Sequence, residues 1–327
     1  MPGTNVFVLG VAVQSGKGAP ATAPQFLTAA RSRDLMPNPE RGRLEETGTG
    51  RDGGERETTL IGLGGSVEIY LRPTIAGLMM YGLLGANATV GTGPEPATAP
   101  YTHTATAADD QPWLTFFPYW GDTLFERYMD CKVTAGTIAG SAGQSMTGNF
   151  TVGGLDYEKL AAKPAGGELD TGAVIRVPGV TYTVEAAVNN AITEFSMQID
   201  AAQNLQQTTK ITNSFMEPGL RTVQMTYSQV FEDLGPYEKA NYGGPGGTQP
   251  SQVIHRNAWQ GAFVDAENTP RLTLDVPNLA YMTSPLPVNA NGEIAIYQIT
   301  AEADPVTAGS IVSSEIVNGT ASYAPAA

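Results

Sequence analysis

The chain has few of the side chains on which catalytic and metal sites depend, with one cysteine and two histidines in 327 residues. A single cysteine, Cys131, excludes a disulfide framework within the chain and a cysteine-rich zinc site. His103 and His255 have no Ser, Cys or carboxylate at the spacing of a known nucleophile motif. We therefore expect two ordinary hydrogen-bonded or exposed histidines, a buried Cys131, and no active site, metal or cofactor.

Charge is also scarce, since Asp, Glu, Lys and Arg make up 15% of the residues. The chain contains 38 Gly and 23 Pro, and this composition excludes coiled coils and long helical bundles. Its 41% of hydrophobic residues argues against global disorder. With 18 basic and 32 acidic residues the net charge is −14, which disfavours a surface that grips nucleic acid through its phosphates.

Long apolar runs are absent. The longest run, residues 74–86, is shorter than the roughly 20 residues that a membrane span needs. The N-terminus lacks the basic and apolar regions of a secretory signal, so we expect a soluble chain made in a cytoplasm, without membrane insertion. Gly16-Lys17-Gly18 is not a phosphate loop, because the glycine and the Ser or Thr that the motif requires are missing.

Strand patterns dominate what is present. Apolar and polar residues alternate with a period of two, which is typical of antiparallel sheets with one buried and one polar face. The runs are residues 67–72, 180–184, 195–200, 223–227, 272–276 and 294–296. One helix is expected over Thr74–Leu84, and weaker candidates are 123–129 and 155–162. The fold class is therefore mainly β.

Residues 31–57 form the most unusual segment, because they combine 13 charges of both signs with many glycines and no apolar periodicity. The charged residues are Arg31, Arg33, Asp34, Glu40, Arg41, Arg43, Glu45, Glu46, Arg51, Asp52, Glu55, Arg56 and Glu57. A long segment of this kind is usually functional or disordered. It is either a solvated loop or an arm that becomes ordered by pairing with a neighbouring subunit.

A faint internal repeat suggests a duplication. Residues 112–116 and 270–274 share a Pro-x-Leu-Thr-apolar pattern, 158 residues apart. We expect two similar units, a first half of residues 1–164 and a second half of residues 165–327, with the boundary near Pro164.

The order of these features resembles the tail tube, or major tail, proteins of bacteriophages with long non-contractile tails. The resemblance covers residues 5–160 and rests on order and style rather than on an invariant motif. The residues that carry it are 7–13, the charged 41–46, the strand 65–73 followed by 74–85, then 101–104, 113–119 and 131–152.

The resemblance implies a β-sandwich with a flanking helix, in which one sheet of each subunit joins a continuous barrel around a channel. It makes Arg31–Glu57, the arm, a contact to the adjacent ring, with ten proposed contact residues. These are Arg31, Arg33, Glu40, Arg41, Arg43, Glu45, Glu46, Arg51, Glu55 and Arg56. Some relatives fuse two tube domains, so three chains per ring are expected, and six are possible.

The function implied is that of a structural virion protein, not an enzyme, whose stacked rings form the conduit for DNA ejection. Genomic DNA would pass through without specific binding, and other tail proteins would sit at the tube ends. Assembly would occur in the host bacterial cytoplasm. Two alternatives are the tube of a contractile tail or secretion-type injection system, and a non-enzymatic β-sandwich binding module.

Overall fold

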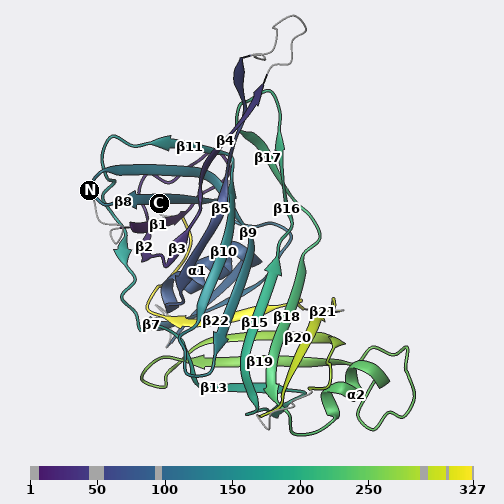
Figure 1. Cartoon of the computed structure of the whole chain (residues 1–327). Coiled ribbons are helices and arrows are strands. Elements are labelled where there is room, and N and C mark those ends of the chain that lie inside the picture. Colours follow the sequence, from purple (N-terminus) through teal and green to yellow (C-terminus); the bar gives the residue numbers. More distant parts are fainter. Residues whose placement is uncertain (1–6, 44–54, 93–97, 288–293, 307–308, 326–327) are drawn as a thin grey trace, which may run out of the picture.

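The chain forms antiparallel-rich sheets with little helix (Figure 1). The computed structural model describes residues 7–43, 55–92, 98–287, 294–306 and 309–325, and within these ranges it contains 22 strands and two helices. The expectation of a mainly β fold is confirmed. None of the described helices is long and apolar enough to cross a membrane.

One long sheet runs through both halves of the chain, and its strands stand side by side in Figure 1. From one edge to the other it consists of β3 (Ser32–Arg33) with β4 (Met36–Arg43), β5 (Arg56–Tyr70), β10 (Thr147–Gly154), β9 (Leu124–Ser141), β15 (Ile192–Asp200), β18 (Thr222–Val230), β21 (Ile296–Ala303) and the end of β20 (Pro270–Thr283). All of these pairings are antiparallel.

A first flanking sheet uses the beginning of β9. Its order is β12 (Glu168–Leu169), β2 (Phe26–Ala29), β1 (Phe7–Val13), β8 (Leu114–Trp120), β9 and β11 (Asp156–Lys159). The expected helices at 123–129 and 155–162 are therefore wrong, because residues from both segments lie in β9 and β11. Tyr128 and Leu155 are buried. Short apolar runs are compatible with either a helix or a strand, and tertiary packing selects the strand here.

A second flanking sheet uses the beginning of β20. Its order is β14 (Ala187–Val188), β13 (Arg176–Val184), β19 (Arg256–Val264), β20, β22 (Ser313–Asn318), β7 (Thr98–Ala107) and β6 (Gly85–Thr92). A separate hairpin consists of β16 (Gln203–Gln207) and β17 (Asn213–Pro218). β9 and β20 thus each pass from a flanking sheet into the long sheet.

The core lies between the long sheet and the flanking elements, and one cluster contains residues from all three sheets. In the second half, Phe195 of β15 meets Trp259 and Phe263 of β19, with ring centroids 5.8 and 5.1 Å apart. Pairing of β9 with β15 and of β22 with β7 crosses residue 164. The division into residues 1–164 and 165–327 stays a prediction.

Helix α1 (Pro73–Leu84) confirms the helix expected at Thr74–Leu84, and it is buried on nearly every side. Pro73 starts it in a position where its missing N–H costs nothing. The second helix, α2 (Gly235–Tyr242), was not expected. It has eight residues, most of them half-buried and only Pro236 fully buried, so it has no apolar stripe that a sequence pattern would show.

Gly77 of α1 lets the C-terminal segment dock. A Cβ there would come within 2.7 Å of the Tyr323 ring carbon Cζ, and Tyr323 is buried and donates its hydroxyl to the Thr74 carbonyl at 2.9 Å.

We expect Gly77→Ala to lower the free energy of unfolding by about 1–3 kcal/mol through overpacking. Gly244→Ala is the matched control, because a Cβ at Gly244 meets nothing within 4 Å. Urea denaturation of the two variants measures the difference, and equal stabilities would contradict this account of the packing.

Candidate functional site: a projecting hairpin and a polar sheet face

The far ends of β4 and β5 form a two-stranded hairpin that projects beyond the long sheet (Figure 1). The two strands pair from Met36 and Gly64 outwards to Arg43 and Arg56, whereas β10 pairs with β5 only as far as Leu63. The outer part of the hairpin is largely exposed. A two-stranded hairpin is marginally stable by itself in water, so this one needs further contacts to hold its direction.

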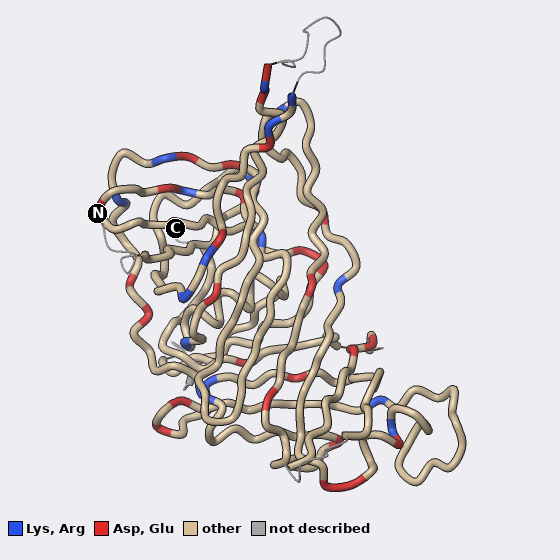
Figure 2. Tube along the Cα trace, viewed as in Figure 1, with Lys and Arg blue, Asp and Glu red and all other residues tan. Residues whose placement is uncertain are grey.

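Five of the ten proposed contact residues lie exposed on this projection, where Figure 2 shows both charge signs. They are Glu40, Arg41, Arg43, Glu55 and Arg56. None of the five forms an ion pair with another described residue. Arg43 and Arg56 face each other across the strands, and like charges in that position repel. The hairpin therefore presents charges that its own chain leaves unneutralised within the described part.

Arg31 and Arg33 lie at the base of the hairpin and are engaged inside the chain. Arg31 pairs with Glu68 at 2.6 Å and stacks on Tyr70. The Arg33 guanidinium lies 4.4 and 4.3 Å from the ring centroids of Phe7 and Trp120. Cation–π contacts of this kind hold a side chain in place, and composition alone does not reveal them. The remaining three proposed residues, Glu45, Glu46 and Arg51, lie outside the described residues.

The second feature is the exposed face of the long sheet, where side chains alternate with the buried ones. One row across six strands reads Glu68, Asn149, Thr137, Gln198, Gln224 and Glu302. The full set on this polar face is Ser66, Glu68 and Tyr70 of β5; Thr147, Asn149 and Thr151 of β10; Ala135, Thr137, Ala139 and Ser141 of β9; Glu194, Ser196, Gln198 and Asp200 of β15; Thr222, Gln224, Thr226 and Ser228 of β18; and Ile296, Gln298, Thr300 and Glu302 of β21.

The strand positions of the polar face are acidic or neutral. Four acids occupy them, and no Lys or Arg stands at any of them on the six strands. Arg31, which precedes β3, reaches the edge of this face, where it pairs with Glu68 and stacks on Tyr70. The opposite face of the same strands is largely apolar where it is buried, as with Ile69, Met197 and Met225. The period of two in the sequence therefore sets both the core and a broad face of hydroxyl and amide groups.

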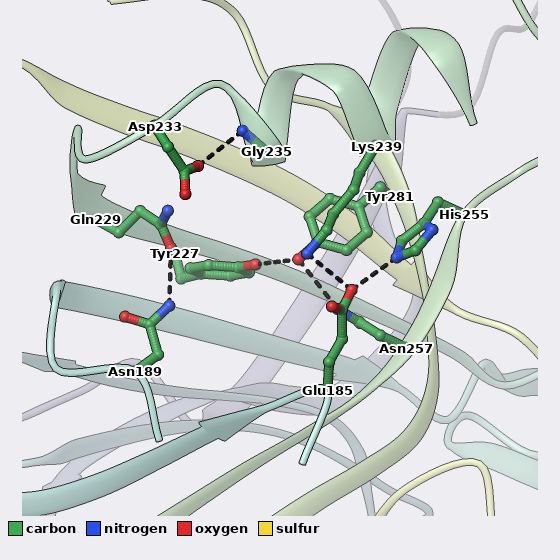
Figure 3. Close-up of polar contacts among 10 residues, drawn as sticks. All are labelled: Glu185, Asn189, Tyr227, Gln229, Asp233, Gly235, Lys239, His255, Asn257 and Tyr281. Carbon is green, nitrogen blue, oxygen red and sulfur yellow. Dashed lines mark hydrogen bonds and ion pairs between the residues drawn. The ribbon is translucent and has the colours of Figure 1, made fainter. Parts of the chain in front are cut away.

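A polar cluster stands at the end of the molecule opposite the hairpin, where Figure 3 shows side chains converging on Glu185. The Glu185 carboxylate accepts hydrogen bonds from Lys239 Nζ at 2.8 Å, His255 Nε2 at 2.7 Å and Asn257 Nδ2 at 3.2 Å. Asn257 also donates to the Tyr281 hydroxyl at 3.1 Å. The cluster joins the β13–β14 turn to α2 and β19, and a cavity of about 490 Å³ opens beside it.

The backbone at this turn is unusual, since Glu185 and Ala186 both have positive φ, +55° and +62°. Such turns favour Asn-Gly, and other residues there carry strain. The contacts of Glu185 offset that strain. Its carboxylate accepts hydrogen bonds from three donors. The cluster therefore links the β13–β14 turn to α2 and β19, and we call this link the Glu185 tie.

The other histidine and the cysteine are also engaged. His103 is buried, its Nδ1 lies 2.9 Å from the Thr89 hydroxyl, and its Nε2 lies 2.8 Å from the Thr320 carbonyl. Burial lowers the pKa of His103 and raises the pKa of the Cys131 thiol. Across the part of the chain that the structure describes, no group of three or more His, Cys, Asp or Glu side chains could hold a metal ion.

The contacts of Glu185 make the stability of the fold depend on pH. Burial raises the pKa of this carboxyl, but the hydrogen bonds from Lys239 and His255 outweigh burial and hold the pKa below its ordinary 4.5. The stabilisation is therefore complete above pH 4.5 and is lost as pH falls through the folded value. We expect Glu185→Gln to cost about 1 kcal/mol at pH 7, after allowance for partial exposure, and less at pH 3. Glu315→Gln, at an exposed strand position, is the control in urea titrations at both pH values. An equal cost at both pH values would refute the tie.

Comparison with known proteins identifies the family. A family described as phage tail tube protein matches residues 4–311, nearly the whole chain. No curated protein matches. Among solved structures, the cryo-EM structure of the anti-feeding prophage cap (AFP tube terminating cap) is 16% identical to this chain. The match covers 49% of this chain and 96% of that one, with a TM-score of 0.31. On the match over residues 4–311, the chain belongs to the phage tail tube protein family.

Proposed function

We propose that the chain builds the wall of a tail tube as stacked rings, with the polar face of the long sheet turned towards the channel. The observation that carries the proposal is that the six strands place four acids and no Lys or Arg on that face, and that Arg31, which reaches its edge, is paired with Glu68. A wall of this kind repels phosphate, so DNA passes along it without binding. As a member of its family the chain is a structural component of the virion. We propose that it acts without enzymatic activity and assembles in the host cytoplasm.

The edges of the long sheet supply the contacts within a ring. Among the described strands, β3 and β4 pair with β5 alone, and Ile296–Ile299 of β21 pair with β18 alone. Open edges of this sort invite aggregation unless another chain covers them. Inside the chain, β9 already pairs with β15, and this pairing joins the sheet of the first half to the sheet of the second half. Repeating that junction from one copy to the next closes a barrel without free edges.

Two tube units in each chain, and hence three chains per ring, are supported by the order of elements. In the first half the hairpin β4–β5 precedes α1, β8, the shared strand β9 and then β10. In the second half β15 and β18 precede α2, β19, the shared strand β20 and then β21. In this comparison β8 corresponds to β19. The sequence match between residues 112–116 and 270–274 instead pairs β8 with β20, and these two strands are not equivalent in the topology. The ring of three chains rests on topology rather than on that match.

The projecting hairpin supplies the contact between rings, and other tail proteins complete the tube at its ends. The exposed Glu40, Arg41, Arg43 and Arg56 would find opposite charges on a subunit of the next ring. Arg–carboxylate contacts are directional and can order a segment of the chain. Because a single exposed pair contributes only about 0.2–1 kcal/mol, several pairs must act together around each ring.

The contact between rings predicts the behaviour of an arm-truncated chain. Replacing residues 41–57 with a short turn should leave a folded subunit that forms no tubes, since none of the described residues among them is buried. A charge-reversed chain with Arg41→Glu, Arg43→Glu and Arg56→Glu should show the same loss, whereas Lys at the same three positions should retain part of the assembly. Sedimentation and electron microscopy measure tube formation. Normal tubes from the truncated chain would rule out this role.

The orientation of the polar face predicts a second result. Gln198→Lys with Gln298→Lys puts two cations on that face, at positions where no acid stands directly opposite on a neighbouring strand. Tubes should still form, and they should retain DNA at low salt and release it at higher salt, because lysine–phosphate contacts depend on counterion release. The control carries Gln260→Lys and Gln252→Lys, which lie exposed outside the long sheet. If control tubes retain as much DNA, the face does not line the channel.

A further inference from the structure

A second hairpin, β16–β17, rises beside the projecting hairpin (Figure 1). It lies between β15 and β18, so the chain leaves the long sheet after Asp200 and returns at Thr222. It forms a two-stranded sheet of its own. Its residues come from the second half of the chain, whereas the hairpin that it accompanies comes from the first half.

Direct hydrogen bonds join the two hairpins. The Ile61 N–H donates to the Ile211 carbonyl at 2.7 Å, and Ile61 and Thr212 form a parallel bridge. Gln207 Nε2 donates to the Thr59 carbonyl at 2.9 Å. These contacts begin where β10 stops pairing with β5, at Leu63. The second hairpin therefore takes over the side of β5 that the long sheet leaves open.

The second hairpin is itself seated on the body of the protein. A Cβ on Gly153 of β10 would meet Leu205 Cδ1 at 3.2 Å and Met216 Cε at 3.3 Å, so this glycine makes room for the two apolar side chains. On the other side, Lys17 Nζ donates to the Ser214 carbonyl at 2.9 Å and lies 4.8 Å from the Phe215 ring centroid. The second hairpin is therefore held by apolar packing at Gly153 on one side and by the Lys17 ammonium on the other.

We propose that β16–β17 is a brace that fixes the direction of the projecting hairpin, and that stacking of rings depends on it. This inference rests on the proposed role of the projecting hairpin. A two-stranded hairpin that leaves its sheet is marginal in water. Holding it in the bound direction before contact lowers the entropy lost on association. Gln207 and the tip at residues 208–212 are positioning residues, and they act on the next ring through Thr59 and Ile61.

Two variants test the brace in the full chain. Gln207→Ala removes the side-chain bond, and replacement of residues 208–212 with Asn-Gly removes the Ile211 carbonyl while Leu205 and Met216 keep their seat. Gln206→Ala is the control, because Gln206 is exposed on the same strand and pairs with Phe215 of its own hairpin. We expect amide exchange at Ile61 to speed up at least tenfold in the shortened variant, with an unchanged global unfolding midpoint. The concentration needed for tube formation should rise severalfold.

The outcomes separate this inference from the proposal beneath it. A higher concentration needed for tube formation by both brace variants, with the control like the wild type, supports the brace. Unchanged exchange at Ile61, or faster exchange with tubes forming at the wild-type concentration, overturns it. If the arm-truncated chain fails to stack while the brace variants stack normally, the projecting hairpin keeps its role and the brace loses it. If the arm-truncated chain stacks normally, both fall.

Discussion

The antiparallel ladder between β9 and β15 is the contact on which the rest of the architecture depends. It pairs Ala135–Ser141 with Glu194–Asp200 and so joins the sheet of the first half to the sheet of the second. Because residues directly opposite in a ladder point to the same side, the polar rows of both halves fall on one continuous face. The same ladder brings the second hairpin beside the projecting one. A shift of one residue would turn the apolar side of β15 into solvent.

Two demands meet on this sheet. In the proposed tube, the wall of the channel must not bind phosphate, and the edges of the sheet must be covered. The six strands meet the first demand because their polar positions hold Ser, Thr, Asn, Gln and four acids, but no Lys or Arg. The second is answered inside the chain by the β9–β15 ladder and, in the proposed ring, by a copy of the same junction. Low charge in the body also leaves the mixed charges of the projecting hairpin as its main electrostatic feature.

The sequence predicted the features that depend on local periodicity. Alternation in residues 67–72, 195–200 and 223–227 indicated strands of the long sheet, and the apolar spacing of Thr74–Leu84 indicated α1. Strand β4 gave no such signal, because Pro37 and Pro39 interrupt it. Prolines are tolerated there since β4 is an edge strand among those described. The charges of residues 31–57 were evident in the sequence. The sequence did not show that some of them lie on a projecting hairpin while Arg31 and Arg33 lie at its base.

The missed features depend on distant contacts. Arg33 is held by Phe7 and Trp120, which no local pattern links to it. The Glu185 cluster draws on a turn, a short helix and a strand, and its strained turn resembles no standard turn sequence. The second hairpin has little alternation, because its apolar residues divide between a seat on Gly153 and solvent. Such elements are specified by tertiary packing and stay invisible in the sequence alone.

The most direct test of the central claim is a cryo-EM reconstruction of assembled tubes at a resolution that places side chains. We predict that Glu68, Gln198, Gln224 and Glu302 line the channel, with the sheet edge formed by β21 and the end of β20 in one copy beside β3 and β4 of the next. A reconstruction in which this face points outward, or is buried against another layer of protein, would contradict the account.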